Sequence, residues 1–92
     1  MDDMGESMGP MVDPCHPGEL LRADLEASDM RRGVLAAKLG MDRSNLYRLL
    51  DGRIALTARV ALALEHMGWS TAEHWMRLQV QYDLAQARRA AA

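Results

Sequence analysis

Residues 32–53, RGVLAAKLGMDRSNLYRLLDGR, decide the fold of this chain. Leucines recur at helical spacing on both sides of Gly40, and a second glycine, Gly52, closes the stretch. Glycine commonly ends a helix because it adopts left-handed backbone angles without strain. Asp42, shortly after the turn, is a suitable N-cap for a following helix. The stretch therefore predicts two short helices joined by a tight turn, which is the helix-turn-helix arrangement.

The basic residues of the chain gather in the same stretch. Residues 31–59 hold seven Arg or Lys residues and two acidic residues, a balance of +5. Residues 1–30 hold eight acidic residues against one arginine, a balance of −7, and residues 60–92 are balanced. A basic middle in an acidic chain predicts one face for a polyanion and another for a basic partner. The alternative is a chance excess of charge on a solvated helical surface.

Composition limits the fold class. The chain has 92 residues, 49% of them hydrophobic, which suits one small domain and excludes a wholly disordered chain. Phe is absent and β-branched residues are few, which favours helices over strands. Cys15 alone cannot form an intrachain disulfide, and no apolar run is long enough to cross a membrane. We expect a soluble, reduced, cytoplasmic all-α domain over residues 15–92, preceded by a flexible tail at residues 1–14.

Residues that start and stop helices predict a compact bundle of five. The expected helices span residues 17–28, 31 or 32 to 39, 43–51, 57–67 and 71–89. Pro17 suits the first helical position, and Thr57 is a good cap for the fourth helix. Ser70-Thr71-Ala72-Glu73 has the form of a capping box at the start of the longest helix.

Apolar residues at helical spacing predict which faces are buried. The inward positions expected in the first two helices are Leu20, Leu21, Leu25, Val34, Leu35, Ala36 and Leu39. The stripe of the longest helix expected to pack on the core is Trp75, Leu78, Tyr82 and Ala85. A second set on that helix still needs burial and predicts a homodimer interface: Met76, Val80 and Leu84. The start of the first helix, around Leu21, is the alternative place for that interface.

The outer face of the helix after Gly40 carries the candidate DNA-reading residues. Such a helix enters the major groove with its N-terminal half toward the bases. Arg can bond guanine at two atoms and Ser can contact either base type, so the predicted base contacts are Arg43, Ser44 and Arg48. The predicted contacts to the DNA backbone are Arg32, Lys38, Asn45, Tyr47 and Arg53. For Tyr47, contact with a thymine methyl group and plain exposure are open alternatives.

No pattern in the chain indicates enzymatic chemistry. His16, His66 and His74 lack the spacing of metal ligands, and Cys15 has no companions of a nucleophilic site. The sequence also lacks paired carboxylates, a glycine-rich phosphate loop and a Ser-His-Asp set. We therefore expect a protein that is not an enzyme and that uses no metal and no cofactor.

Several short motifs, spread over about four-fifths of the chain, match one known family. They are His-Pro-Gly-Glu at 16–19, Leu35-Ala36, Lys38-Leu39-Gly40, Leu50-Asp51-Gly52-Arg53, Trp75-Met76-Arg77-Leu78-Gln79 and Tyr82-Asp83-Leu84. With them the chain resembles the HigA-type antitoxins, a branch of the Xre-like, phage-repressor-type helix-turn-helix family. The first motif and the last two distinguish this branch from generic phage-type repressors, which share only the middle.

The resemblance implies a phage-repressor-like fold and an antitoxin of a type II toxin–antitoxin system. Its implied partner is a small basic toxin, a HigB/RelE-like ribonuclease that cleaves mRNA. It also implies a homodimer that represses its own operon by binding a palindromic operator in double-stranded DNA. The family usually begins its second helix with a capping Ser and a phosphate-binding Gln. This chain has Arg31-Arg32-Gly33-Val34 there, so Asp29 is the candidate substitute cap.

Two other functions fit the same residues. One is a stand-alone Xre-like transcriptional repressor without a toxin, and the other is a helical interaction module that never contacts DNA. A neighbouring reading frame for a small basic protein would separate the antitoxin from the repressor. Salt-dependent DNA binding would separate both from the interaction module.

Overall fold

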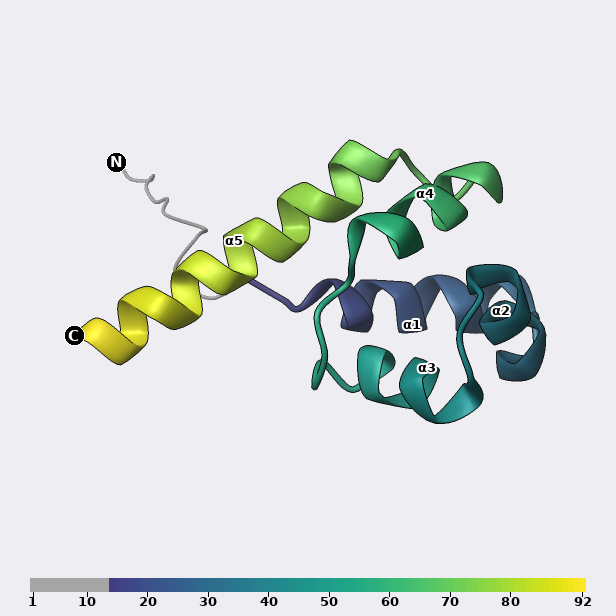
Figure 1. Ribbon diagram of the computed structural model, residues 1–92, viewed down its shortest axis with the longest axis horizontal. Coiled ribbons are helices and arrows are strands. Elements are labelled where there is room, and N and C mark those ends of the chain that lie inside the picture. The colour runs from purple at the N-terminus through teal and green to yellow at the C-terminus, as the bar shows by residue number, and fades with distance from the viewer. Residues whose placement is uncertain (1–13) are drawn as a thin grey trace.

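The computed structural model describes residues 14–92, which form five α-helices and no strand (Figure 1). The helices are α1 (Pro17–Ser28), α2 (Arg32–Leu39), α3 (Arg43–Leu50), α4 (Ala58–His66) and α5 (Ala72–Ala91). The predicted all-α, five-helix chain is confirmed, and every predicted helix end lies within about two residues of the observed one. The tail predicted for residues 1–14 falls, apart from Pro14, outside the described residues.

Leucines from α1 to α4 form most of the core. Leu21, Leu35, Leu46, Leu49 and Leu64 have no solvent exposure, and Trp75 of α5 closes the cluster. Each fully buried leucine contributes roughly 1.5–3 kcal/mol relative to an exposed one. Figure 1 shows α1 between α3 on one side and α4 with α5 on the other, so α1 is the central helix. The core therefore fixes the position of α3 through α1 and α2.

α1 approaches α3 so closely that one contact position tolerates no side chain. A Cβ built on Gly18 would lie 1.8 Å from the carbonyl oxygen of Leu49. His16, the residue just before the first residue of α1, caps this helix, since its Nδ1 accepts a hydrogen bond of 2.9 Å from the backbone N–H of Gly18. Pro17 occupies the first helical position, where its missing N–H costs nothing. The His-Pro-Gly motif thus has a structural role in docking α1 on α3.

Polar contacts fasten α5 to the rest of the domain. Gln79, which is buried, accepts a 2.7 Å hydrogen bond from the backbone N–H of Leu56 and donates one to Asp83. Tyr82 meets the ring of His16 edge to face, with centroids 4.8 Å apart. Burial lowers the pKa of His16 below its usual 6.5, and the nearby charge of Asp83 opposes part of that shift. The last turns of α5 project away from the body of the domain (Figure 1).

Two predicted helix caps are wrong. Thr71, not Ser70, caps α5, and its Oγ1 accepts the backbone N–H of His74 at 3.1 Å. Ser70 has a positive φ of 68° and belongs to the turn before the helix. Asp29 does not cap α2, because it ends α1 with a left-handed φ of 62°. The residue at the N-cap of α2 is Arg31, which makes no side-chain capping bond.

Two predicted inward residues are exposed. Val34 is 46% exposed because it lies about 100–160° around the helix from each buried residue of α2. Leu20 is 39% exposed, since α1 buries Pro17, Leu21 and Leu25 on a different face. Both errors arise because helical spacing alone allows more than one apolar face. The two side chains are therefore available at the surface.

Candidate nucleic-acid interface

The turn between α2 and α3 is fixed by hydrogen bonds at both helix ends. Gly40 has a φ of 68°, and its N–H points back to the carbonyls of Ala36 and Ala37. Asp42 accepts the backbone N–H of Asn45 at 2.8 Å and the hydroxyl of Ser44 at 3.0 Å. These two hydrogen bonds lower the pKa of Asp42, the backbone one contributing most. The start of α3 therefore has one well-defined direction.

α3 has a buried face and a basic outer face. Leu46, Leu49 and Leu50 are buried in the core. The outer face exposes the predicted base contacts together with a half-exposed ring: Arg43, Ser44, Tyr47 and Arg48. Arg48 donates from Nη1 to the side-chain oxygen of Asn45 at 3.0 Å. The structure therefore places all three predicted base contacts on one exposed helix face, with Asn45 holding Arg48.

A hollow of about 680 Å³ opens between the end of α1, the start of α2 and α3. Its lining includes three arginines (Arg31, Arg32 and Arg43) and the ring of Tyr47. The guanidinium carbon of Arg32 lies 5.6 Å from the centre of that ring. The Nε of Arg32 is shielded from solvent and, within residues 14–92, has no hydrogen-bond partner. Glu26 and Asp29 also line this hollow.

The start of α2 makes this hollow suited to an anion. Because Arg31 gives no side-chain cap, the first backbone N–H groups of α2 lack a side-chain acceptor. Helix N-termini carry partial positive charge and commonly hold phosphate groups. The sequence did not single out Arg31 or Val34 as lining residues; the run of arginines at 31 and 32 was the available signal.

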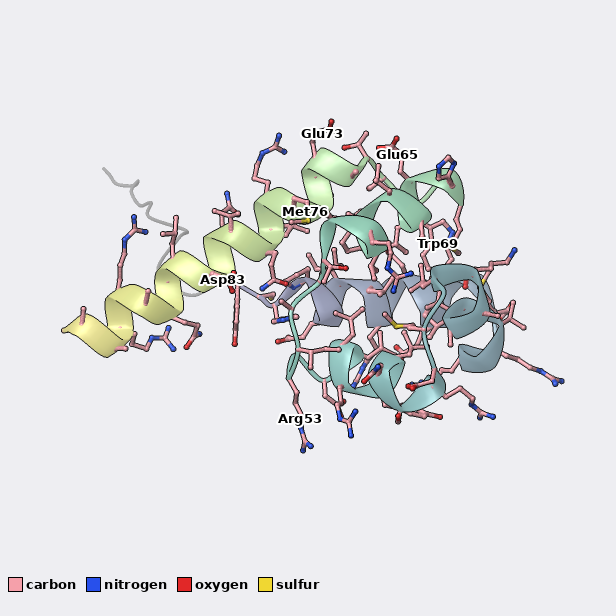
Figure 2. The ribbon with its side chains drawn as sticks, in the orientation of Figure 1. Arg53, Glu65, Trp69, Glu73, Met76 and Asp83 are labelled. Atoms are coloured by element: carbon pink, nitrogen blue, oxygen red, sulfur yellow. The ribbon has the colours of Figure 1, made fainter. Side chains whose placement is uncertain are left out.

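Arg53 lies at the other end of the basic face. Its side chain extends from the body of the domain beside the end of α3 (Figure 2). Arg22 of α1 forms an ion pair with Asp51, which fixes the chain just before Arg53. Lys38 is exposed in the last turn of α2. Arg59 lies against the turn, since its Nη1 is 2.9 Å from a Cβ built on Gly40.

The predicted dimer residues on α5 differ in exposure. Val80 and Leu84, one turn apart, are 50% and 45% exposed. Met76 is half-buried and packs against the core of its own chain (Figure 2). A hydrophobic strip thus runs along the outer side of α5 beyond the core.

No group of three His, Cys, Asp or Glu residues within residues 14–92 is placed to hold a metal ion. No helix in the same range is long and apolar enough to cross a membrane.

Comparison with known proteins identifies the family. No family model matches the chain. The antitoxin HigA-1 of Vibrio cholerae is 33% identical over 76 residues, which cover 82% of this chain and 71% of that protein. This chain belongs to the HigA-type antitoxins. Virulence-associated protein A' of Dichelobacter nodosus is also similar, with 32% identity over 77 residues that cover 83% of this chain and 67% of that one.

Solved structures agree with this assignment. The antitoxin HigA of Pseudomonas aeruginosa, solved with the higBA promoter, superposes with a TM-score of 0.77 at 32% identity. The match covers 84% of this chain and 85% of that one. Relatives named as an antitoxin and as an HTH-type transcriptional regulator agree with the expectation that this HigA-type protein is not an enzyme. The phage-repressor-type helix-turn-helix fold predicted from the sequence is therefore confirmed.

Proposed function

We propose that this HigA-type protein is a cytoplasmic antitoxin that represses its own operon and neutralises a small basic HigB/RelE-like toxin that cleaves mRNA. The observation that carries the proposal is the basic face of α3 beside the arginine-lined hollow at the start of α2. The Pseudomonas HigA solved with promoter DNA supports the same use of the fold. The two halves of the function, DNA binding and toxin binding, are separable by experiment.

In the proposed complex α3 lies in the major groove. Arg43 and Arg48 contact guanines, and a good bidentate Arg–guanine pair supplies roughly 1–3 kcal/mol of discrimination. The hydroxyl of Ser44 already donates to Asp42, so its free lone pairs accept hydrogen bonds from a base amino group. Asn45 is half-buried and bonded to Arg48, which favours a role next to the backbone and in support of Arg48.

Phosphates occupy the two ends of the basic face in this proposal. The hollow beside Arg32 takes one phosphate, which becomes the missing cap of α2. Tyr47 stacks under Arg32 and borders that phosphate. Arg53 takes a second phosphate beyond the end of α3, and Lys38 adds a weaker contact. Phosphate contacts fix the register of α3 without reading sequence.

A dimer is needed because one recognition helix covers few base pairs. Two-fold dimers of such proteins read palindromes whose half-sites lie about 34 Å apart or a multiple of that. The strip of Val80 and Leu84 on α5, with Met76 at its inner edge, is the proposed interface. Burying it in a second copy also adds stability to a small domain.

One experiment in cells tests both halves. A small basic protein whose reading frame neighbours that of this chain is the candidate toxin; it is expressed alone and then together with this chain, while a reporter follows the operon's own promoter. We expect the basic protein alone to stop growth, and the pair to grow and repress the reporter. If the chain represses the reporter but the basic protein neither stops growth nor is neutralised, the protein is a stand-alone repressor. Rescue without repression would refute the DNA-binding half.

A further inference from the structure

A second surface hollow lies on α1 away from the recognition helix. Its volume is about 370 Å³, and its lining is Asp24, Ala27, Ser28, Trp69 and Ser70. The first three belong to α1 and the last two to the connection between α4 and α5. Trp69 is half-buried, and its carbonyl accepts the indole N–H of Trp75, which fixes the backbone there. A helix and a hydrogen-bonded connection therefore form the walls of the hollow.

This hollow faces away from DNA in the proposed complex. Arg22 marks the side of α1 that faces the end of α3, because it pairs with Asp51. At about 100° per residue, Asp24 and Ala27 lie roughly 140–160° around the helix from Arg22. Figure 2 shows the same separation, with Trp69 and Arg53 on opposite sides of α1. A molecule bound beside Trp69 leaves α3 uncovered.

The surface of the hollow combines one carboxylate with apolar groups. Asp24 is the acidic residue of its lining, whereas Glu19 and Glu26 of α1 lie on the side of Arg22 and Asp51. Leu20, 39% exposed, lies one turn before Asp24 on the same side of the helix. A carboxylate beside an indole ring fits a Lys or Arg side chain, which gains both an ion pair and a cation–π contact. Small Ala27 and Ser28 leave room for that side chain to enter.

We propose that the basic toxin partner docks on this α1 surface and places one Lys or Arg side chain in the hollow between Asp24 and Trp69. The inference rests on the proposed antitoxin function and adds the docking surface to it. Asp24 attracts a basic side chain of the partner, and Leu20 with Trp69 supplies apolar contact beside that charge. Because α3 stays free, toxin and operator bind the same chain at once.

The test uses the candidate toxin, a purified basic protein whose reading frame neighbours that of this chain, titrated calorimetrically into the full-length chain. Asp24→Lys reverses the proposed attraction and leaves α1 with a residue of high helix propensity. Trp69→Leu removes the ring and keeps an apolar side chain against the core. Glu73→Lys is the matched control, since it makes the same change of charge at an exposed site on α5. Operator affinity and the melting temperature are measured for each variant.

We expect Asp24→Lys to weaken toxin binding at least about tenfold and Trp69→Leu about fivefold, as for anchor residues of an interface. Glu73→Lys should change it less than about twofold, and operator affinity should stay unchanged in all three. Unchanged toxin binding by Asp24→Lys and Trp69→Leu would overturn this inference and leave the antitoxin function intact. A wild-type chain that does not bind the basic protein would overturn both. If toxin and operator displace each other from the wild-type chain, the claim that they bind separate surfaces is refuted.

Discussion

Gly18→Ala is the sharpest perturbation that the fold offers, because a single methyl group is placed where there is no space. The new Cβ would lie 1.8 Å from the carbonyl oxygen of Leu49 and 2.9 Å from its carbonyl carbon. Real Cβ atoms essentially never come within 3.0 Å of a heavy atom that is distant in the chain. Both obstructing atoms are backbone, so no side chain can rotate away. α1 and α3 must move apart by more than 1 Å, roughly the shortfall to that limit.

The expected loss follows from comparing two opposing effects. Gly→Ala in a helix interior normally stabilises by up to about 1 kcal/mol. Overpacking a close-packed contact costs typically about 1–3 kcal/mol and occasionally more. Separation also opens gaps around buried Leu21 and Leu49, which adds to the loss. We therefore expect a net destabilisation of about 2–3 kcal/mol, or about 8–24 °C in Tm for a domain of this size.

Urea and thermal unfolding at one fixed protein concentration measure this change, since the proposed dimerisation would make Tm concentration-dependent. Gly33→Ala is the matched control. A Cβ there would meet only the Arg43 side chain, at 3.9 Å, so we expect a gain of about 0.5–1 kcal/mol. If Gly18→Ala is as stable as Gly33→Ala, the close approach of α1 to α3 is not a constraint on the fold, and the reasoning fails.

Three further predictions concern DNA reading, pH and assembly. Arg43→Ala and Arg48→Ala should each relax base preference at particular operator positions by about 1–3 kcal/mol in a binding selection, and unchanged preference in both would remove α3 from base readout. The folded-state pKa of His16 lies below 6.5, so its contribution to stability is present above pH 6.5 and is lost as the pH falls through the folded-state value. Urea midpoints of wild type and His16→Asn should therefore converge on acidification, and parallel pH profiles would contradict the role of His16. Val80→Asp and Leu84→Asp should shift light-scattering mass from dimer to monomer, and a dimer untouched by either would place the interface elsewhere.

Much of the fold could be predicted from the sequence because local signals and tertiary packing agree. Gly40 and Asp42 set the turn between α2 and α3, and Thr57 caps α4 as expected. Leucines alone almost fill the core, so their spacing locates the buried faces of α3 and α4. In these elements the same residues favour the helix in isolation and its burial in the bundle.

The errors arise where two neighbours carry the same local signal. Ser70 and Thr71 are both good caps, and the left-handed turn that places Ser70 outside the helix has no sequence signal, because Ser rarely adopts it. Val34 and Leu35 are both apolar, and only the packing of α2 on α3 and α4 selects Leu35. Local pattern gives a set of candidates, and contacts distant in sequence choose among them.

The sequence predicts the exposed face of α3 better than the shape of the surface beside it. The charged outer face of α3 follows directly from helical periodicity. The hollow beside Arg32 does not, because it requires the end of α1 to lie next to the start of α2 and the ring of Tyr47. The contact of Gly18 with Leu49 is likewise invisible in the sequence, since it joins residues 31 positions apart.

Fluorescence anisotropy titration of the wild-type chain onto DNA from upstream of its own operon tests the central claim most directly. The comparison duplex has the same length and composition with the sequence scrambled, and both are titrated over a range of salt concentrations. We predict at least about a thousandfold preference for the native duplex and an affinity that falls steeply with salt. The Arg32→Ala variant should lose affinity for both duplexes alike and flatten the salt slope by about one. Equal binding of the two duplexes by the wild type, or an affinity independent of salt, would contradict the claim that this protein is a sequence-specific repressor.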